Sequence, residues 1–157
     1  MMTQDAEKRA QLNVTAIENG TVIDHIDSES TFQVASILQV ESEDDVVLVG
    51  MNLPSGKLGT KGIIKVANRQ LTAEEVNKIA LVARHATLNI IKDYEVVSKS
   101  AIELPDRIQG TVRCFNPTCV TNKQPVETRF EVTEGEPPVL RCLYCEKSMT
   151  AEDVVLA

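Results

Sequence analysis

Apolar residues recur along the chain with two different spacings, and these spacings predict most of its regular structure. Alternating or β-branched runs are typical of strands, and such runs recur through the first hundred residues. The strands predicted from them lie at 12–16, 21–26, 46–49, 63–67, 87–91 and 95–97. Apolar residues at three- and four-residue steps indicate a helix instead, and this spacing occurs within 29–40.

A second helix is predicted to begin at Thr72. The hydroxyl of Thr72 and the carboxylate of Glu75 fit a capping box, in which each satisfies a backbone amide of the first turn. The order of elements is then strand, helix, strand, strand, helix, strand, with one extra short strand. This order is typical of a ferredoxin-like fold, an antiparallel sheet with two helices on one face. The other face of the sheet is left open to a ligand or to a second copy of the chain.

The periodic pattern stops at both ends of this region. Residues 1–11 are polar without periodic apolar positions, and we expect a mobile arm there. Pro105 disfavours a helix before it, so 101–110 is interpreted as a linker. Extended segments follow near 126–132, 138–142 and 154–156. We therefore predict an α+β chain with a larger N-terminal domain at 12–100 and a small antiparallel β domain at 111–157.

All four cysteines of the chain fall within 32 residues of the second domain. They form a C-x4-C pair and a C-x2-C pair, spacings that allow thiolates from two turns to converge on one tetrahedral Zn²⁺. Two disulfides or four unrelated buried thiols are the alternatives, but disulfide frameworks belong to small exported domains and the polar N-terminus shows no signal peptide. Because four sulfurs close the coordination shell, we predict one structural zinc per chain, bound by Cys114, Cys119, Cys142 and Cys145. A domain of about fifty residues needs such a clamp.

Composition argues against several classes of function. The net charge is −7, and both parts of the chain are acidic: 10 basic against 14 acidic residues up to residue 100, and 6 against 9 after it. A nucleic-acid-binding protein normally carries a basic face, and an aromatic content of 3% without Trp leaves few residues for base stacking. The longest apolar run, 46–51, is far shorter than the roughly twenty residues that span a membrane. We therefore expect a cytoplasmic protein that binds neither nucleic acid nor membrane.

Few residues are suited to catalysis. His25 and His85 have no serine or cysteine context that indicates a nucleophile. The dipeptide Asp24-His25 is more often a surface or capping feature than a functional pair. Lys65 and Lys99 lie within or just after predicted strands, where two cations on an open sheet face would suit a triphosphate. The alternative is that both ammonium groups extend from a rim into water.

Several segments together resemble the regulatory chain of aspartate carbamoyltransferase, from about Leu12 to the C-terminus. They are Gly20–Ile26, Asn52–Gly56, Ile64–Lys65, Tyr94–Val97 with Lys99–Ser100, the Cys114-x4-Cys119 pair and Cys142–Lys147. The resemblance implies a non-catalytic subunit of pyrimidine biosynthesis that pairs with itself and bridges trimers of a separate catalytic chain. It also implies that the N-terminal domain binds ATP as activator and CTP as inhibitor, in some members with UTP and Mg²⁺. The zinc domain would contact the catalytic chain.

The same resemblance implies three sets of site residues. The nucleotide site would consist of Ala16, Ile17, Asp24, His25, Lys65, Asn89, Ile91, Tyr94, Val96 and Lys99. Lys65 and Lys99 would meet phosphate or ribose, and Asn89, Ile91 and Tyr94 would line the base pocket. A second nucleotide near the dimer axis would contact Asn52, Leu53 and Lys61, and the catalytic chain would contact Asn116, Glu146 and Lys147. Two positions depart from a well-studied relative, which has an acidic residue in place of Thr15 and an asparagine in place of Thr118. The first departure bears on base discrimination, and the second bears on contacts with the catalytic chain.

Two alternative functions can be considered from the residues alone. A zinc-ribbon module that binds nucleic acid or a larger complex is the first, and the charge distribution disfavours it. The second is an enzyme acting through Asp24 and His25, which the lack of a nucleophile or an open metal disfavours.

Overall fold

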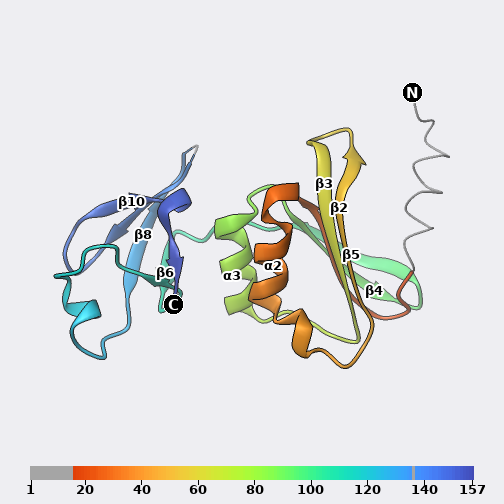
Figure 1. Cartoon of the computed structure of the whole chain (residues 1–157), viewed down its shortest axis with the longest axis horizontal. Helices are drawn as coiled ribbons and strands as arrows, with labels where there is room; N and C mark the ends of the chain where they lie inside the picture. Colours follow the sequence, from red (N-terminus) through yellow and green to blue (C-terminus); the bar gives the residue numbers. More distant parts are fainter. Residues whose placement is uncertain (1–15, 136) are drawn as a thin grey trace. The chain divides into compact units, whose positions relative to one another are not determined.

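The computed structural model describes residues 16–135 and 137–157 (Figure 1). The predicted arm at 1–11, most of the predicted strand at 12–16, and Thr15 lie outside the described residues. The chain divides into two compact units: residues up to Leu71 with His85–Ala101 form the first, and Thr72–Arg84 with Ile102–Ala157 form the second. Within the described part, no helix is long and apolar enough to cross a membrane.

The first unit is built on a five-stranded antiparallel sheet with the strand order β2-β3-β1-β4-β5. Its strands are β1 (Gly20–Ile26), β2 (Val47–Ser55), β3 (Gly59–Ala67), β4 (Thr87–Lys92) and β5 (Glu95–Ala101). The helix α2 (Thr31–Leu38) connects β1 to β2, between the single turns η1 (Ser28–Ser30) and η2 (Val40–Ser42). Both edges of the sheet, β2 and β5, therefore belong to hairpins.

Alternation along the central strands separates the two faces of this sheet. Ile23 of β1 pairs with Ile64 of β3, and both are fully buried, as are Val34 and Leu38 of α2. On the opposite face, Val22 contributes to a smaller apolar cluster with Ile17, Ile63 and Ile91. The helix therefore covers one face, and the other face combines a few apolar residues with the polar residues described below.

The hairpin of β2 and β3 is longer than the sequence predicts. The predicted strands at 46–49 and 63–67 left Gly59 and Gly62 in the loop between them, but β2 extends to Ser55 and β3 begins at Gly59. A Cβ atom on Gly62 would overlap the side chain of Thr31, so glycine is required there by close packing and not by a turn. A glycine that looks like a loop signal thus lies inside a strand.

The second unit contains α3 (Ala73–Val82) and short strands. A four-stranded sheet has the order β10-β9-β8-β6, and β11 pairs with β7. The bounds are β6 (Arg107–Gln109), β7 (Val112–Arg113), β8 (Arg129–Thr133), β9 (Val139–Cys142), β10 (Ser148–Thr150) and β11 (Val155–Leu156), with the single turns η3 (Val120–Asn122) and η4 (Ala151–Asp153). The α+β class, the antiparallel sheets and the two helices are confirmed.

The second unit has its own core. Phe130 and Leu140 from adjacent strands are almost completely buried and pack with Val112, with the cysteines and with Leu81 of α3. The predicted capping box of α3 is present, since Thr72 Oγ1 accepts from the Glu75 amide at 3.1 Å and Glu75 Oε1 accepts from the Thr72 amide at 3.0 Å.

The predicted linker contains a strand. Within 101–110, β6 pairs with β8 through the buried Ile108. A three-residue strand with one apolar position is too short to show a period. The domain boundaries at 12–100 and 111–157 stay a prediction, and α3, which lies inside the first of these ranges, is grouped with the second unit.

Candidate metal centre and open sheet face

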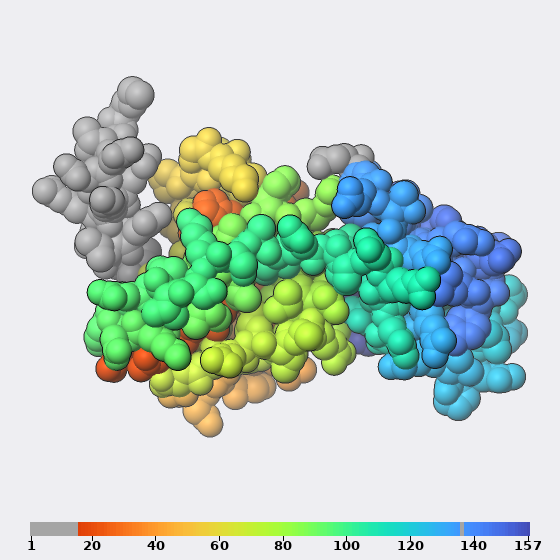
Figure 2. Space-filling view, turned by 180° about the vertical axis from the view of Figure 1, so that it is seen from behind, coloured from red at the N-terminus to blue at the C-terminus, as the bar shows by residue number. Residues whose placement is uncertain are grey.

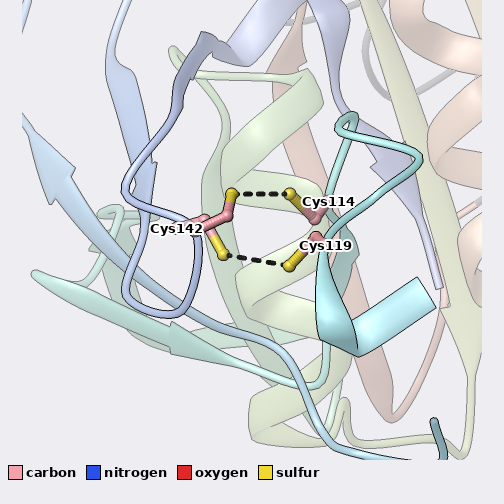
Figure 3. Close-up of side chains that lie close together, drawn as sticks. Cys114, Cys119 and Cys142 are labelled. Atoms are coloured by element: carbon pink, nitrogen blue, oxygen red, sulfur yellow. Dashed lines mark hydrogen bonds between the residues drawn. The ribbon is translucent and has the colours of Figure 1, made fainter. Parts of the chain in front are cut away.

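The four cysteines are free thiols whose sulfur atoms form one cluster (Figure 3). All four Sγ atoms lie within 4.8 Å of one another, with 3.6 Å between Cys114 and Cys145 and 3.8 Å between Cys119 and Cys142. A disulfide would bring two sulfurs to about 2.05 Å, so the disulfide alternative is wrong. Tetrahedral ligands at about 2.3 Å from a zinc ion are about 3.8 Å apart. The cluster therefore fits a tetrahedral metal ion.

Two short turns bring these sulfurs together. In the first turn, the Cys119 amide donates to Asn116 O at 3.0 Å. In the second, the Glu146 amide donates to Cys142 O and the Cys142 amide donates to Lys147 O, both at 2.9 Å. Glu146 has a φ of 65°, a left-handed conformation that reverses the chain after the last cysteine. Each pair of cysteines is thus presented by local backbone bonds.

Burial and hydrogen bonding act on the thiols in opposite directions. Burial raises the pKa of Cys114 to about 12, although the Asn116 amide bonds to its sulfur. Burial also acts to raise the pKa of Cys145, but hydrogen bonds from the Lys147 amide and the Asn116 side chain outweigh it and lower that pKa to about 7. Metal ligands have to be thiolates. The donors around the cluster supply part of the stabilisation that this charge needs.

A row of paired residues crosses the open face of the first sheet. Strand pairing joins Leu48, Lys65, Val22, Asn89 and Lys99 in that order across the five strands. Directly paired residues point to the same face of a sheet, so Lys65 and Lys99 share the face that α2 does not cover. Three strand spacings of about 4.8 Å place their backbones roughly 14 Å apart. An anionic ligand of that length could contact both ammonium groups.

Asn89, between the two lysines in this row, is buried with one unsatisfied atom. The residue is 8% exposed, and its Oδ1 is the buried side-chain acceptor without a hydrogen-bond partner among the described residues. Such an atom costs about 1–3 kcal/mol unless a donor satisfies it. A ligand that offers an N–H or O–H group would remove this cost.

Of the other two residues predicted for the base pocket, Ile91 lies two positions after Asn89 on β4 and so on the same face, and Tyr94 lies in the turn between β4 and β5. Ile91 pairs with Gly20 and with Val96, and it packs with Ile17. The Tyr94 amide donates to Glu18 O at 2.9 Å, which holds the segment after Ala16 against the turn between β4 and β5. Tyr94 is 64% exposed. Every residue of β5 is exposed, and this part of the chain lies on the surface seen in Figure 2.

A buried ion pair joins residues that were predicted for two different sites. Lys61 Nζ lies 2.8 Å from Asp24 Oδ1, with side chains 7% and 14% exposed. The same carboxylate oxygen accepts from the His25 amide at 2.7 Å, and His25 Nδ1 lies 3.1 Å from Thr87 Oγ1. Burial lowers the pKa of His25; Asp24 opposes this shift and Lys61 adds to it. Burial also lowers the pKa of Lys65. Sequence reasoning missed Thr87, because only strand register places it opposite Asp24.

The other two residues predicted for a second nucleotide lie on β2. Leu53 pairs with Lys61 and packs against the apolar cluster of the open face. Asn52 is exposed, has a φ of 58°, and its amide donates to Ser28 Oγ at 3.3 Å. The structure thus brings Leu53 to Lys61 and leaves the Asn52 side chain at the surface.

The residues predicted to face a catalytic chain differ in exposure. Asn116 is 7% exposed, and its Oδ1 accepts from the amide and the hydroxyl of Thr118. Glu146 and Lys147 are exposed on the second turn, where Glu146 lies 3.4 Å from Arg141. The two turns also expose three large apolar side chains that sequence reasoning missed: Phe115, Leu143 and Tyr144. Each of them is adjacent to a cysteine in sequence, which is the signal that could have found them.

Known proteins resemble this chain over nearly its whole length. The family model described as the allosteric domain of the aspartate carbamoyltransferase regulatory chain matches residues 12–103, and the model described as the metal binding domain of the same chain matches residues 106–155. A curated aspartate carbamoyltransferase regulatory chain from Pyrococcus abyssi is 51% identical over 148 residues, which cover 93% of this chain and 97% of that protein. The chain of the same name from Bacteroides fragilis is 46% identical, with 96% of this chain and 99% of that protein covered. The one from Methanothermobacter thermautotrophicus is 44% identical, with 96% and 97% covered.

Proposed function

Because this chain belongs to the family of aspartate carbamoyltransferase regulatory chains, we propose that it is a non-catalytic subunit that controls a separate catalytic chain in pyrimidine biosynthesis. Its first unit binds CTP as inhibitor and ATP as activator. Its metal-binding unit contacts the catalytic chain. A nucleotide with different affinities for two states of the assembly shifts the equilibrium between them, which is the thermodynamic requirement for any such control.

The row across the open sheet face is the observation that supports nucleotide binding most strongly. Lys65 and Lys99 supply two cations on one face, and the buried Oδ1 of Asn89 lies between them without a partner in the described structure. A nucleoside triphosphate offers anionic phosphates for the lysines and a base or ribose that donates to an acceptor such as Asn89 Oδ1. The apolar residues Ile17 and Ile91, which pack with Val22 beside this row, suit contact with the base.

The remaining predicted residues complete the same proposal. Ala16, Tyr94 and Val96 flank the base, while Asp24 and His25 line the phosphate side near Lys65. A second nucleotide, UTP with Mg²⁺, uses Asn52, Leu53 and Lys61. The close contact of Lys61 with Asp24 supports a link between the two nucleotide positions.

The metal is proposed to be one structural Zn²⁺ per chain. An all-sulfur ligand set favours zinc over magnesium or calcium, which prefer oxygen. The sulfur separations of 3.6 and 3.8 Å agree with tetrahedral thiolates around zinc. With four protein ligands, no position is open to water or substrate, so the metal would serve stability.

The surface beside the metal is proposed to contact the catalytic chain. Phe115, Leu143 and Tyr144 are 52%, 37% and 40% exposed on turns that the metal holds rigid. Aromatic and large apolar side chains in exposed positions are typical of protein interfaces. Asn116, Glu146 and Lys147 supply the polar contacts around them. The chain is further proposed to pair with a second copy of itself, as the family resemblance implies.

Titration calorimetry with CTP and ATP tests the nucleotide site. Charge-assisted hydrogen bonds contribute roughly 1.5–3 kcal/mol, so Lys65→Ala and Lys99→Ala should each weaken triphosphate binding by about tenfold to a hundredfold. Lys92→Ala is the matched control, because Lys92 is an exposed lysine of β4 that follows Ile91 and points to the other face. Unchanged affinity in both test variants, or an equal loss in the control, would refute the site.

A further inference from the structure

Thr121 donates a hydrogen bond to one of the clustered sulfurs. Its Oγ1 lies 3.2 Å from Cys119 Sγ. We propose that Thr121 is a positioning residue of the metal centre, which holds the Cys119 thiolate in its ligand orientation and slows the loss of the metal. This inference rests on the proposed binding of a metal ion by the four cysteines.

Asn122 fixes the segment from which Thr121 reaches the sulfur. Its Nδ2 donates to Cys114 O and to Asn116 O, both at 2.8 Å. Its backbone amide donates to Cys119 O at 3.0 Å, which closes the turn η3. Both hydrogens of one side-chain amide are therefore used to tie η3 back to the first metal-binding turn. Thr121 lies between Cys119 and this anchor, so its hydroxyl is held beside the sulfur.

The charge of the ligand set gives this hydrogen bond its importance. Four thiolates around a divalent cation leave a net negative charge, and Cys119 is 1% exposed, so water does not solvate its sulfur. Hydrogen bonds to an ionised acceptor are stronger than neutral ones. Loss of an outer partner of a metal ligand typically costs tenfold to a hundredfold in metal affinity. The Thr121 hydroxyl is in the position of such a partner.

Thr150 provides a matched control within the same unit, and both threonines are half-buried. Its hydroxyl also donates, but to Asp153 Oδ2 at 3.0 Å and not to a sulfur. Thr150→Val and Thr121→Val therefore make the same chemical change, and only the second removes a donor to a ligand. Thr121→Ser keeps that donor.

The first experiment compares zinc retention in the full-length chain and these three variants. Each protein is loaded with zinc, its metal content is measured, and a chromogenic chelator then reports the rate and the extent of zinc transfer. Thr121→Val should hold zinc about tenfold less tightly, while Thr121→Ser and Thr150→Val should behave like the unchanged chain. Equal retention in Thr121→Val and the unchanged chain, or an equal loss in Thr150→Val, would overturn the inference. If Thr121→Val does not fold, Thr121→Ala removes the same hydroxyl.

A second experiment measures an electronic effect that looser packing alone would not produce. With Co²⁺ in place of zinc, the sulfur-to-metal charge-transfer band should move to lower energy in Thr121→Val, because a hydrogen bond no longer stabilises the sulfur lone pairs. Thr121→Ser should keep the original band, and an unmoved band in Thr121→Val would contradict the proposal. If the chain without substitutions binds no metal, the metal centre itself is refuted. If that chain binds metal and Thr121→Val behaves like it, only the role of Thr121 is refuted.

Discussion

The sulfur cluster and the open sheet face bring their side chains together in different ways. Two turns of at most six residues, 114–119 and 142–145, present the cysteines through local backbone bonds. The row from Lys65 through Asn89 to Lys99 exists only because four separate strands, β3, β1, β4 and β5, pair in one register. A slip of one residue in β4 would send Asn89 to the opposite face. The cluster therefore depends on local structure, and the row depends on the whole sheet.

This difference predicts that either site can lose its structure while the other site keeps its own. Loss of a metal removes a large stabilising interaction from a small core at one step. The sheet is stabilised by many strand pairings and by apolar residues on both faces. The following predictions test that separation, from the largest expected effect to the smallest.

Removal of the metal should have the largest effect. A strong chelator should abolish hydrogen-exchange protection across Ile102–Ala157, since a domain of this size folds insecurely without its clamp. Protection in β1, β3 and β4, and the affinity for CTP, should change little. Hydrogen-exchange mass spectrometry before and after chelation measures both regions, and added zinc is the reversal control. Equal loss of protection in the two regions would show that the sulfur cluster and the sheet do not lose their structure separately.

The substitution Lys61→Ala should have the next largest effect, a loss of stability that is confined to the first unit. Removing one partner of a buried ion pair leaves the other charge unpaired, which costs about 3–5 kcal/mol, and Asp24 is largely buried. Urea unfolding measures the change in free energy. The double variant Lys61→Met with Asp24→Leu should recover most of it.

Lys78→Ala is the control for this prediction. Lys78 lies 3.5 Å from Glu74 in an ion pair of α3 whose carboxylate is 66% exposed, and such pairs contribute about 1 kcal/mol or less. A similar cost for Lys61→Ala and Lys78→Ala would show that burial of the Lys61 pair does not matter.

The smallest expected effect is a pH dependence from His25. Burial lowers the pKa of His25 in the folded chain. At a pH below the ordinary histidine pKa of about 6.5, the unfolded chain therefore binds more protons than the folded chain. The contribution of His25 to stability is therefore complete above about pH 6.5 and is lost as the pH falls toward the folded pKa. His25→Asn, which suits the φ of 54° at this position, should lack this component in unfolding curves at pH 7.5 and 5.5. His85→Asn, at a 46% exposed side chain, should keep it.

The same contrast explains what the sequence could predict. The cysteine spacing and the capping box at Thr72 are local signals, and the structure contains both the sulfur cluster and the box. Gly62 carries a loop signal, yet it lies within β3. The residue is glycine because the side chain of Thr31, distant in sequence, leaves no room for a Cβ. Thr87 and the unsatisfied Oδ1 of Asn89 have no sequence signal, since strand register and burial create both.

The grouping of α3 has a consequence for how this polypeptide can be divided. The chain passes from the first unit to the second after Leu71, returns at His85, and leaves again after Ala101. A gene fragment that ends at residue 103 would encode the whole allosteric-domain match, yet it would leave Leu81, now 3% exposed, without the core around Phe130 and Leu140. The two units are therefore interleaved along the gene, and neither can be exchanged between relatives as one uninterrupted cassette.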